Sequence, residues 1–230
     1  MRTAAIFCAT ALCLSAACSP SAVAGTPSER RLEFDVYLDD ARIGNHLFDL
    51  SDEGGTQVVR SEADFEVKLL FFTAYSYEHR NREVWRDGCL QAIDSRTDSN
   101  GERYAVSGTS TPTGFEVRTV SGEKQLEACV GTFAYWDRAL LERPRLLNSQ
   151  TGEHVTATLR ALDGTRLEID GVQLPVERYA LSGEDIEITL YYASETGQWV
   201  ALDSRLEGGR TLQYRRRNVP SLSAALDVSQ

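Results

Sequence analysis

The chain has 230 residues, of which 24 are Lys or Arg and 34 are Asp or Glu, so its formal net charge is −10. A surface with this excess of negative charge repels phosphate backbones, which argues against a nucleic-acid partner. The length suits one sizeable domain, and we expect a single domain over residues 25–218.

The N-terminus has the features of a cleavable export signal. A basic residue precedes an apolar run over residues 4–17, and the small residues Ala22 and Ala24 follow. This order predicts a signal peptide over residues 1–24, and the run is shorter than the roughly 20 residues of a membrane-spanning helix. An alternative cut would make Cys18 the first residue of a lipid-anchored protein. Both alternatives predict a periplasmic or secreted protein.

Export also suggests a role for the cysteines. Three of the five lie in the predicted leader, so Cys89 and Cys129 remain as a pair in an oxidising compartment. We expect this pair to form a disulfide. A reactive cysteine is the less favoured alternative, because the pair lacks both the Cys-x-x-Cys spacing and a nearby histidine.

The chain after the leader begins with alternating apolar and polar residues. Residues 32–39 and 59–69 show the period of two that is typical of strands with one buried and one solvated face. Gly44 indicates a bulge or a close backbone approach, and Asn100-Gly101 is a strong hairpin signal. Such alternation favours an antiparallel sheet over a parallel one.

The segment 74–85 differs, because neither of its faces is simply apolar. One face could point inward and line a cavity with polar groups, point outward as an amphipathic surface, or fill a barrel wall with its rings. The residues on this face are Tyr75, Tyr77, His79, Asn81, Glu83 and Trp85.

The hydrophobic period changes over residues 133–143, where apolar side chains recur at spacings near three and four until Pro144. This spacing predicts one short helix. Strands then resume, with 154–162 and 166–170 separated by an expected turn at Asp163-Gly164. We therefore predict a mainly β fold, an antiparallel meander of about twelve strands curled into a barrel or half-barrel, with the helix as a plug or cap. Residues 219–230 are expected to form a loose tail.

Sequence motifs for catalysis and cofactor binding are absent. The three histidines lack zinc-ligand spacing, and the chain contains neither a Gly-x-Ser-x-Gly motif nor a glycine-rich phosphate loop. We therefore assign no catalytic residue, metal or cofactor. The most distinctive polar cluster is Asn148–Gly152, with Tyr135 and Trp136 before it. It is either a turn that satisfies backbone groups or the mouth of a pocket.

Seven segments also carry a family resemblance. They are Ile43-Gly44-Asn45-His46, Phe65-Glu66-Val67-Lys68, Glu83-Val84-Trp85-Arg86-Asp87-Gly88-Cys89-Leu90, Asp94-Ser95-Arg96-Thr97, Phe133-Ala134-Tyr135-Trp136, Leu146-Leu147-Asn148-Ser149-Gln150-Thr151-Gly152 and Gly209-Arg210-Thr211-Leu212-Gln213-Tyr214. Together they resemble an uncharacterised bacterial family of exported proteins, unknown-function family 6134, which implies no particular activity. The organisation is more distantly similar to the curved-sheet lipoprotein carriers of the periplasm, a likeness of architecture that does not give function.

Three functions are considered. We expect a non-enzymatic protein that binds or carries an apolar or amphiphilic ligand inside the curved sheet. The alternatives are an envelope enzyme or isomerase that uses His79, Glu83 and Arg96, and an accessory protein for envelope assembly. The expected ligand-binding residues are Tyr75, Tyr77, His79, Trp85, Arg96, Tyr135 and Trp136.

Overall fold

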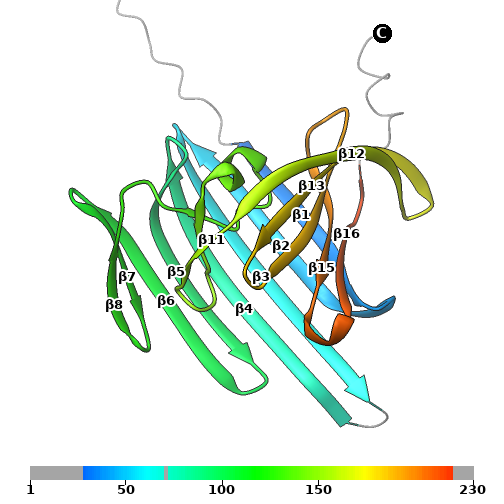
Figure 1. Cartoon of the computed structure of the whole chain (residues 1–230), viewed down its shortest axis with the longest axis horizontal. Coiled ribbons are helices and arrows are strands. Elements are labelled where there is room, and N and C mark those ends of the chain that lie inside the picture. The colour runs from blue at the N-terminus through cyan, green and yellow to red at the C-terminus, as the bar shows by residue number, and fades with distance from the viewer. Residues whose placement is uncertain (1–27, 70–71, 220–230) are drawn as a thin grey trace, which may run out of the picture.

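The computed structural model describes residues 28–69 and 72–219 (Figure 1). The expected leader, with both alternative cut sites at Ala24 and Cys18, lies outside these residues. The expected tail also lies outside them, apart from Val219.

The described residues form sixteen strands and two short 3-10 helices. The first eight strands are β1 (Ser28–Leu38), β2 (Ala41–Glu53), β3 (Thr56–Leu69), β4 (Phe72–Arg86), β5 (Cys89–Ser99), β6 (Glu102–Thr111), β7 (Gly114–Thr119) and β8 (Gly122–Leu126). Next come β9 (Gly131–Thr132), η1 (Arg138–Glu142), β10 (Arg145–Leu147) and β11 (His154–Thr156). The last elements are β12 (Thr158–Ile169), β13 (Val172–Gly183), β14 (Ile186–Ala193), β15 (Trp199–Arg205), η2 (Glu207–Gly209) and β16 (Thr211–Arg216).

Thirteen strands form one antiparallel sheet in the order β12-β13-β14-β15-β16-β1-β2-β3-β4-β5-β6-β7-β8. Sequential strands pair through tight turns, such as Asn100-Gly101 with φ values of 55° and 90°, and β16 pairs with β1 to join the two halves of the chain. The sheet curls without closing, and β12 and β13 arch over the strands of the first half (Figure 1). The prediction of a mainly β, curled antiparallel meander is confirmed.

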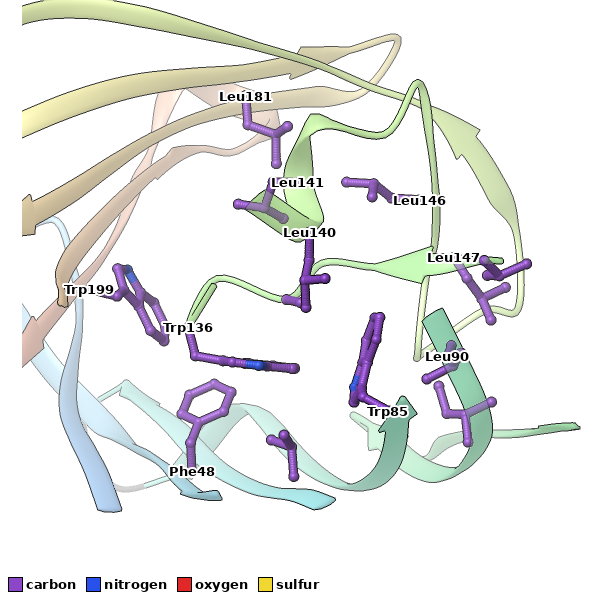
Figure 2. Close-up of a cluster of buried hydrophobic side chains, with 14 of the residues drawn as sticks. Phe48, Trp85, Leu90, Trp136, Leu140, Leu141, Leu146, Leu147, Leu181 and Trp199 are labelled. Atoms are coloured by element: carbon purple, nitrogen blue, oxygen red, sulfur yellow. The ribbon is translucent and has the colours of Figure 1, made fainter. Parts of the chain in front are cut away.

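Residues 127–157, which we call the inner segment, connect β8 to β12 and pack inside the curl. Their strands form a small separate sheet in the order β11-β10-β9. Trp136 and Leu141 of this segment join one hydrophobic core with Phe48 and Trp199 of the large sheet (Figure 2). Burial of these large side chains, each contributing roughly 1.5–3 kcal/mol, holds the inner segment against the sheet.

The helix expected over 133–143 is shorter and of a different kind. Only Arg138–Glu142 is helical, as a single 3-10 turn (η1) whose N-terminus is capped by Asp137 Oδ1, which accepts the Ala139 N–H at 3.0 Å. Leu140 and Leu141 are buried. The apolar spacing over residues 133–143 therefore reflects a compact loop enclosed by the sheet rather than one face of an α-helix. Neither 3-10 helix in the described residues is long and apolar enough to cross a membrane.

The turn expected at Asp163-Gly164 is also absent, because β12 runs through these residues. Its pairing with β13 shifts register between Leu162 and Thr165, so two residues that read as a turn form an irregularity within one strand. The close approach predicted at Gly44 is confirmed. A methyl group there would overlap the carbonyl oxygen of Asp64 on β3.

Cys89 and Cys129 form a disulfide, with their Cα atoms 4.5 Å apart. Cys89 begins β5, whereas Cys129 lies in the inner segment just before β9. The Leu90 N–H donates a hydrogen bond to the Val130 carbonyl at 3.0 Å beside this bond. The disulfide therefore ties the start of the inner segment to the wall of the curled sheet.

Candidate functional site

A cavity originates from small side chains in the middle of the inner face of the sheet. Ser61 and Ala63 of β3 are 5% and 1% exposed, and each lies between larger side chains of β2 and β4. Because interiors are otherwise closely packed, short side chains here leave a hollow above β3. The two cross-strand rows that contain them are His46–Ala63–His79–Thr97 and Phe48–Ser61–Asn81–Ser95.

The hollow, the inner segment and residues of β14 and β15 line a half-open cavity of about 270 Å³, which we call the inner cavity. A second cavity of about 690 Å³, the vestibule, is lined by residues of β8, β11 and the turn between β13 and β14. Phe133, Asn148, Asp185 and Ile186 line both cavities. The vestibule is therefore adjacent to the inner cavity.

The inner face of β4 supplies the polar wall of the inner cavity. Tyr77, His79, Asn81 and Glu83 all line it, because alternate residues of a strand share one face. Of the three arrangements considered for this face, the inward one with a cavity is the one observed.

His79 is held between the sheet and the inner segment. Its Nδ1 atom lies 2.8 Å from the Thr97 hydroxyl on β5, and its Nε2 atom lies 3.5 Å from the Ser149 hydroxyl. Burial, with a smaller contribution from the charge of Arg80, lowers the pKa of His79 to about 4. The imidazole is therefore neutral at pH 7.

Glu83 is a buried carboxyl group that accepts three hydrogen bonds. Asn81 Nδ2 donates to one oxygen at 3.0 Å, while Trp85 Nε1 and the Thr132 hydroxyl donate to the other at 2.9 and 3.2 Å. Burial raises the pKa of Glu83, although these three hydrogen bonds lower it. The neutral form of this side chain is thus favoured relative to an exposed carboxyl group.

The turn Asn148–Gly152 is both structural and part of the cavity wall. Asn148 Oδ1 accepts the N–H groups of Gln150 and Thr151 at 2.8 and 3.2 Å. The Ser149 carbonyl accepts the Ser95 hydroxyl, and Gln150 Oε1 accepts the Tyr77 hydroxyl at 3.0 Å. Both interpretations of this cluster therefore apply, because the turn docks on the sheet and its first three residues line the inner cavity.

Three polar atoms on residues that line the cavity are buried without a hydrogen-bond partner among the described residues. They are His46 Nε2, Asn81 Oδ1 and Trp136 Nε1. A buried polar group left unpaired costs about 1–3 kcal/mol, and such groups are uncommon in folded proteins. Their gathering around one cavity marks it as the candidate binding site.

Four of the seven expected ligand-binding residues meet at the inner cavity, namely Tyr77, His79, Tyr135 and Trp136. Trp85 does not line it. Its indole is 2% exposed and packs edge-on to Trp136 with ring centroids 6.4 Å apart (Figure 2). Its Nε1–H donates a hydrogen bond to Glu83.

The structure places Tyr75 and Arg96 away from this cavity, which corrects the expectation that they line it. Tyr75 is 36% exposed near the start of β4, with its hydroxyl 3.0 Å from that of Ser99. Arg96 is exposed on the outer face, because its neighbours Ser95 and Thr97 point inward. His79, Glu83 and Arg96 therefore do not converge, and the enzyme built on these three residues is not supported.

Sequence reasoning assigned no binding role to His46, Asn81 or Ser61. Asn81 could have been included, because it shares the face of Tyr77 and His79 by the period of two. His46 and Ser61 required the pairing of β2 with β3, which the sequence does not show directly. Within residues 28–69 and 72–219, no three His, Cys, Asp or Glu side chains form a group that could hold a metal ion.

The fold and the site define a class of open, curled β-sheets that enclose a segment of their own chain. One solved structure of similar fold is the crystal structure of a β-barrel-like protein of domain of unknown function DUF1849 from Brucella abortus. The match has a TM-score of 0.58 at 10% identity and covers 81% of this chain and 94% of that one. At this identity the likeness shows the fold alone.

The model of the domain of unknown function DUF6134 matches residues 34–217, so the chain belongs to the DUF6134 family. The resemblance of the seven sequence segments is thereby confirmed. No curated protein matches the chain.

Proposed function

We propose that this protein binds an amphiphilic ligand, with the polar head in the inner cavity and the apolar part in the vestibule. The observation that carries the proposal is the set of unpartnered polar atoms on Trp136, Asn81 and His46. An entirely apolar ligand would leave these atoms unpaired, whereas a polar head could reach them after small side-chain movements.

The two cavities suit the two ends of such a molecule. Phe133 and Ile186 line both, and Leu126 and Val155 extend an apolar strip along the vestibule, whose other lining residues are polar or charged. The cavities hold about 270 and 690 Å³, close to the range of roughly 300–1,000 Å³ for small-molecule sites. An acyl or alkyl chain would therefore pass from the inner cavity towards solvent along these four side chains.

Export is part of this proposal. The protein would act in the periplasm or outside the cell as a non-enzymatic binding protein, either free after cleavage at Ala24 or anchored through Cys18. The mass of the N-terminal peptide of the protein purified from its host distinguishes these two alternatives, since lipidation at Cys18 adds acyl chains.

Native mass spectrometry of the full chain, gently extracted from its host, tests the binding function. We expect a bound lipid-sized mass on the wild type. Ser61→Leu should lose this mass, because Ser61 lines the inner cavity and a leucine at this position would fill part of it. Glu62→Leu places the same side chain on the exposed outer face of the same strand and should retain it.

A wild type that carries no such mass would contradict the proposal. Equal loads on the wild type and on a folded Ser61→Leu variant would also contradict it, because the ligand would then lie elsewhere.

A further inference from the structure

The inner cavity has a wall without positive charge. None of the described residues that line it is Lys or Arg. Burial lowers the pKa of His79 to about 4 and that of His46 well below its usual value, so neither imidazole carries a charge at pH 7. A phosphate or carboxylate head inside this cavity would therefore lose hydration without a counter-charge in the wall, since Lys124 and Arg145 line only the vestibule.

The carboxyl groups of the wall offer little to a cation. Both oxygens of Glu83 are already engaged by three donors, and burial raises the pKa of this carboxyl group. Asp185 is exposed and shared with the vestibule, which places it at the rim. An ammonium head in the inner cavity would thus face a carboxyl group whose two oxygens already accept three hydrogen bonds.

The unpartnered atoms require both a donor and an acceptor. Trp136 Nε1 can only donate, and Asn81 Oδ1 can only accept. His46 Nδ1 lies 3.3 Å from the Tyr214 hydroxyl, which leaves Nε2 as a further unpaired site. A hydroxyl group donates and accepts at once without carrying charge, so two or three hydroxyls on one head group could satisfy all three atoms.

The available space agrees with a small head group. The inner cavity holds about 270 Å³, room for roughly nine water molecules at about 30 Å³ each. The rings of Phe48, Tyr77 and Tyr135 contribute apolar surface between the polar groups. Such a mixture suits the carbon skeleton of a polyol as well as its hydroxyls.

We infer that the head group of the ligand is uncharged and bears several hydroxyls, as in a glycerol or sugar head on an alkyl chain. The inference rests on the proposed function and adds the chemical class of the head. Trp136 would donate to one hydroxyl oxygen, and Asn81 would accept from a hydroxyl.

Isothermal titration of the full chain with four dodecyl amphiphiles, each below its critical micelle concentration, tests this inference. The four heads are glycerol, di-O-methylglycerol, phosphate and trimethylammonium. We expect the glycerol ether to bind at least about tenfold more tightly than each of the others, the ratio that corresponds to one unpaired buried group. The comparison with the dimethyl ether isolates hydroxyl donation without any mutation.

Asn81→Leu adds a protein-side check. In a folded variant, the preference for glycerol over di-O-methylglycerol should disappear, because the acceptor for the ligand hydroxyl is gone. Arg96→Ala, on the outer face, should keep the wild-type preference.

The possible negative results distinguish a failure of this inference from a failure of the proposed function. Equal or tighter binding of a charged head, or of the dimethyl ether, would overturn the inference while leaving an amphiphile-binding function in place. Binding of none of the four amphiphiles would contradict the proposed function and this inference together.

Discussion

The Nδ1 atom of His79 lies 2.8 Å from Oγ1 of Thr97, its direct cross-strand neighbour on β5. This contact fixes the imidazole so that its other nitrogen faces the Ser149 hydroxyl of the inner segment. His79 thereby links three parts of the fold: β4, which carries the polar wall, its neighbour β5, and the turn that covers the wall. Its geometry therefore affects both stability and the shape of the inner cavity.

Replacement of Thr97 by valine should destabilise the protein by about 1–3 kcal/mol. Valine keeps the shape of threonine but leaves His79 Nδ1 buried without its partner. Urea denaturation measures the change, with Thr109→Val, an exposed position on β6, as the matched control. If Thr97→Val loses no more free energy of unfolding than Thr109→Val, this hydrogen bond does not contribute to stability.

Stability should fall when the pH is lowered from 7 to 4. Burial lowers the folded-state pKa of His79 to about 4 from 6.5, so the unfolded chain binds a proton at pH values where the folded chain does not. The stabilisation is complete above pH 6.5 and decreases as the pH falls towards 4, by about 3 kcal/mol for this residue. His46, whose pKa is also lowered, acts in the same direction.

Urea denaturation of the wild type and of His79→Gln at several pH values between 4 and 7 measures this contribution. The variant should show a weaker dependence on pH over this range. Identical slopes for the two proteins would mean that His79 titrates normally in the folded state.

The strands and their inward faces were largely predictable because each depends on local alternation. On β4, the period of two correctly grouped Tyr77, His79, Asn81 and Glu83. The same period could have excluded Arg96, since Ser95 and Thr97 on either side of it point inward. The sequence pattern could therefore have predicted that Arg96 lies on the outer face.

Other features depend on contacts that the sequence does not reveal. Tyr75 shares the face of Tyr77, yet it lies beside a register shift between Val67 and Lys68, near the end of the hairpin where it is exposed to solvent. Trp85 is separated from the cavity by its packing against the inner segment. The apolar spacing over 133–143 indicated burial correctly but could not distinguish an α-helix from an enclosed loop.

Reduction of the disulfide between Cys89 and Cys129 should lower the melting temperature. The bond closes a loop with a sequence separation of 40 residues, and restriction of the unfolded chain by such a loop contributes about 3–4 kcal/mol. Differential scanning calorimetry with and without reductant measures the shift. The double variant Cys89→Ala/Cys129→Ala should be insensitive to reductant, and an unchanged wild-type melting curve after verified reduction would refute this contribution.

Glu83→Gln should become more stable relative to the wild type as the pH rises from 4 to 8. Burial raises the folded-state pKa of Glu83 above its ordinary value of 4.5. The folded state therefore favours the protonated form, and stability that is present below pH 4.5 decreases as the carboxyl group ionises in the folded protein. Glutamine has the same shape and cannot ionise, so the variant should lack this decrease.

The local hydrogen bonds support the same expectation. A glutamine at position 83 can still accept from Trp85 Nε1 and the Thr132 hydroxyl. Its amide can also donate to Asn81 Oδ1 once the Asn81 amide rotates, which would pair an atom that has no partner now. Chemical denaturation at each pH gives the difference between variant and wild type, with the exposed Glu53→Gln as the baseline. A difference for Glu83→Gln that stays constant over this pH range, like that of the baseline, would show that burial does not control the ionisation of Glu83.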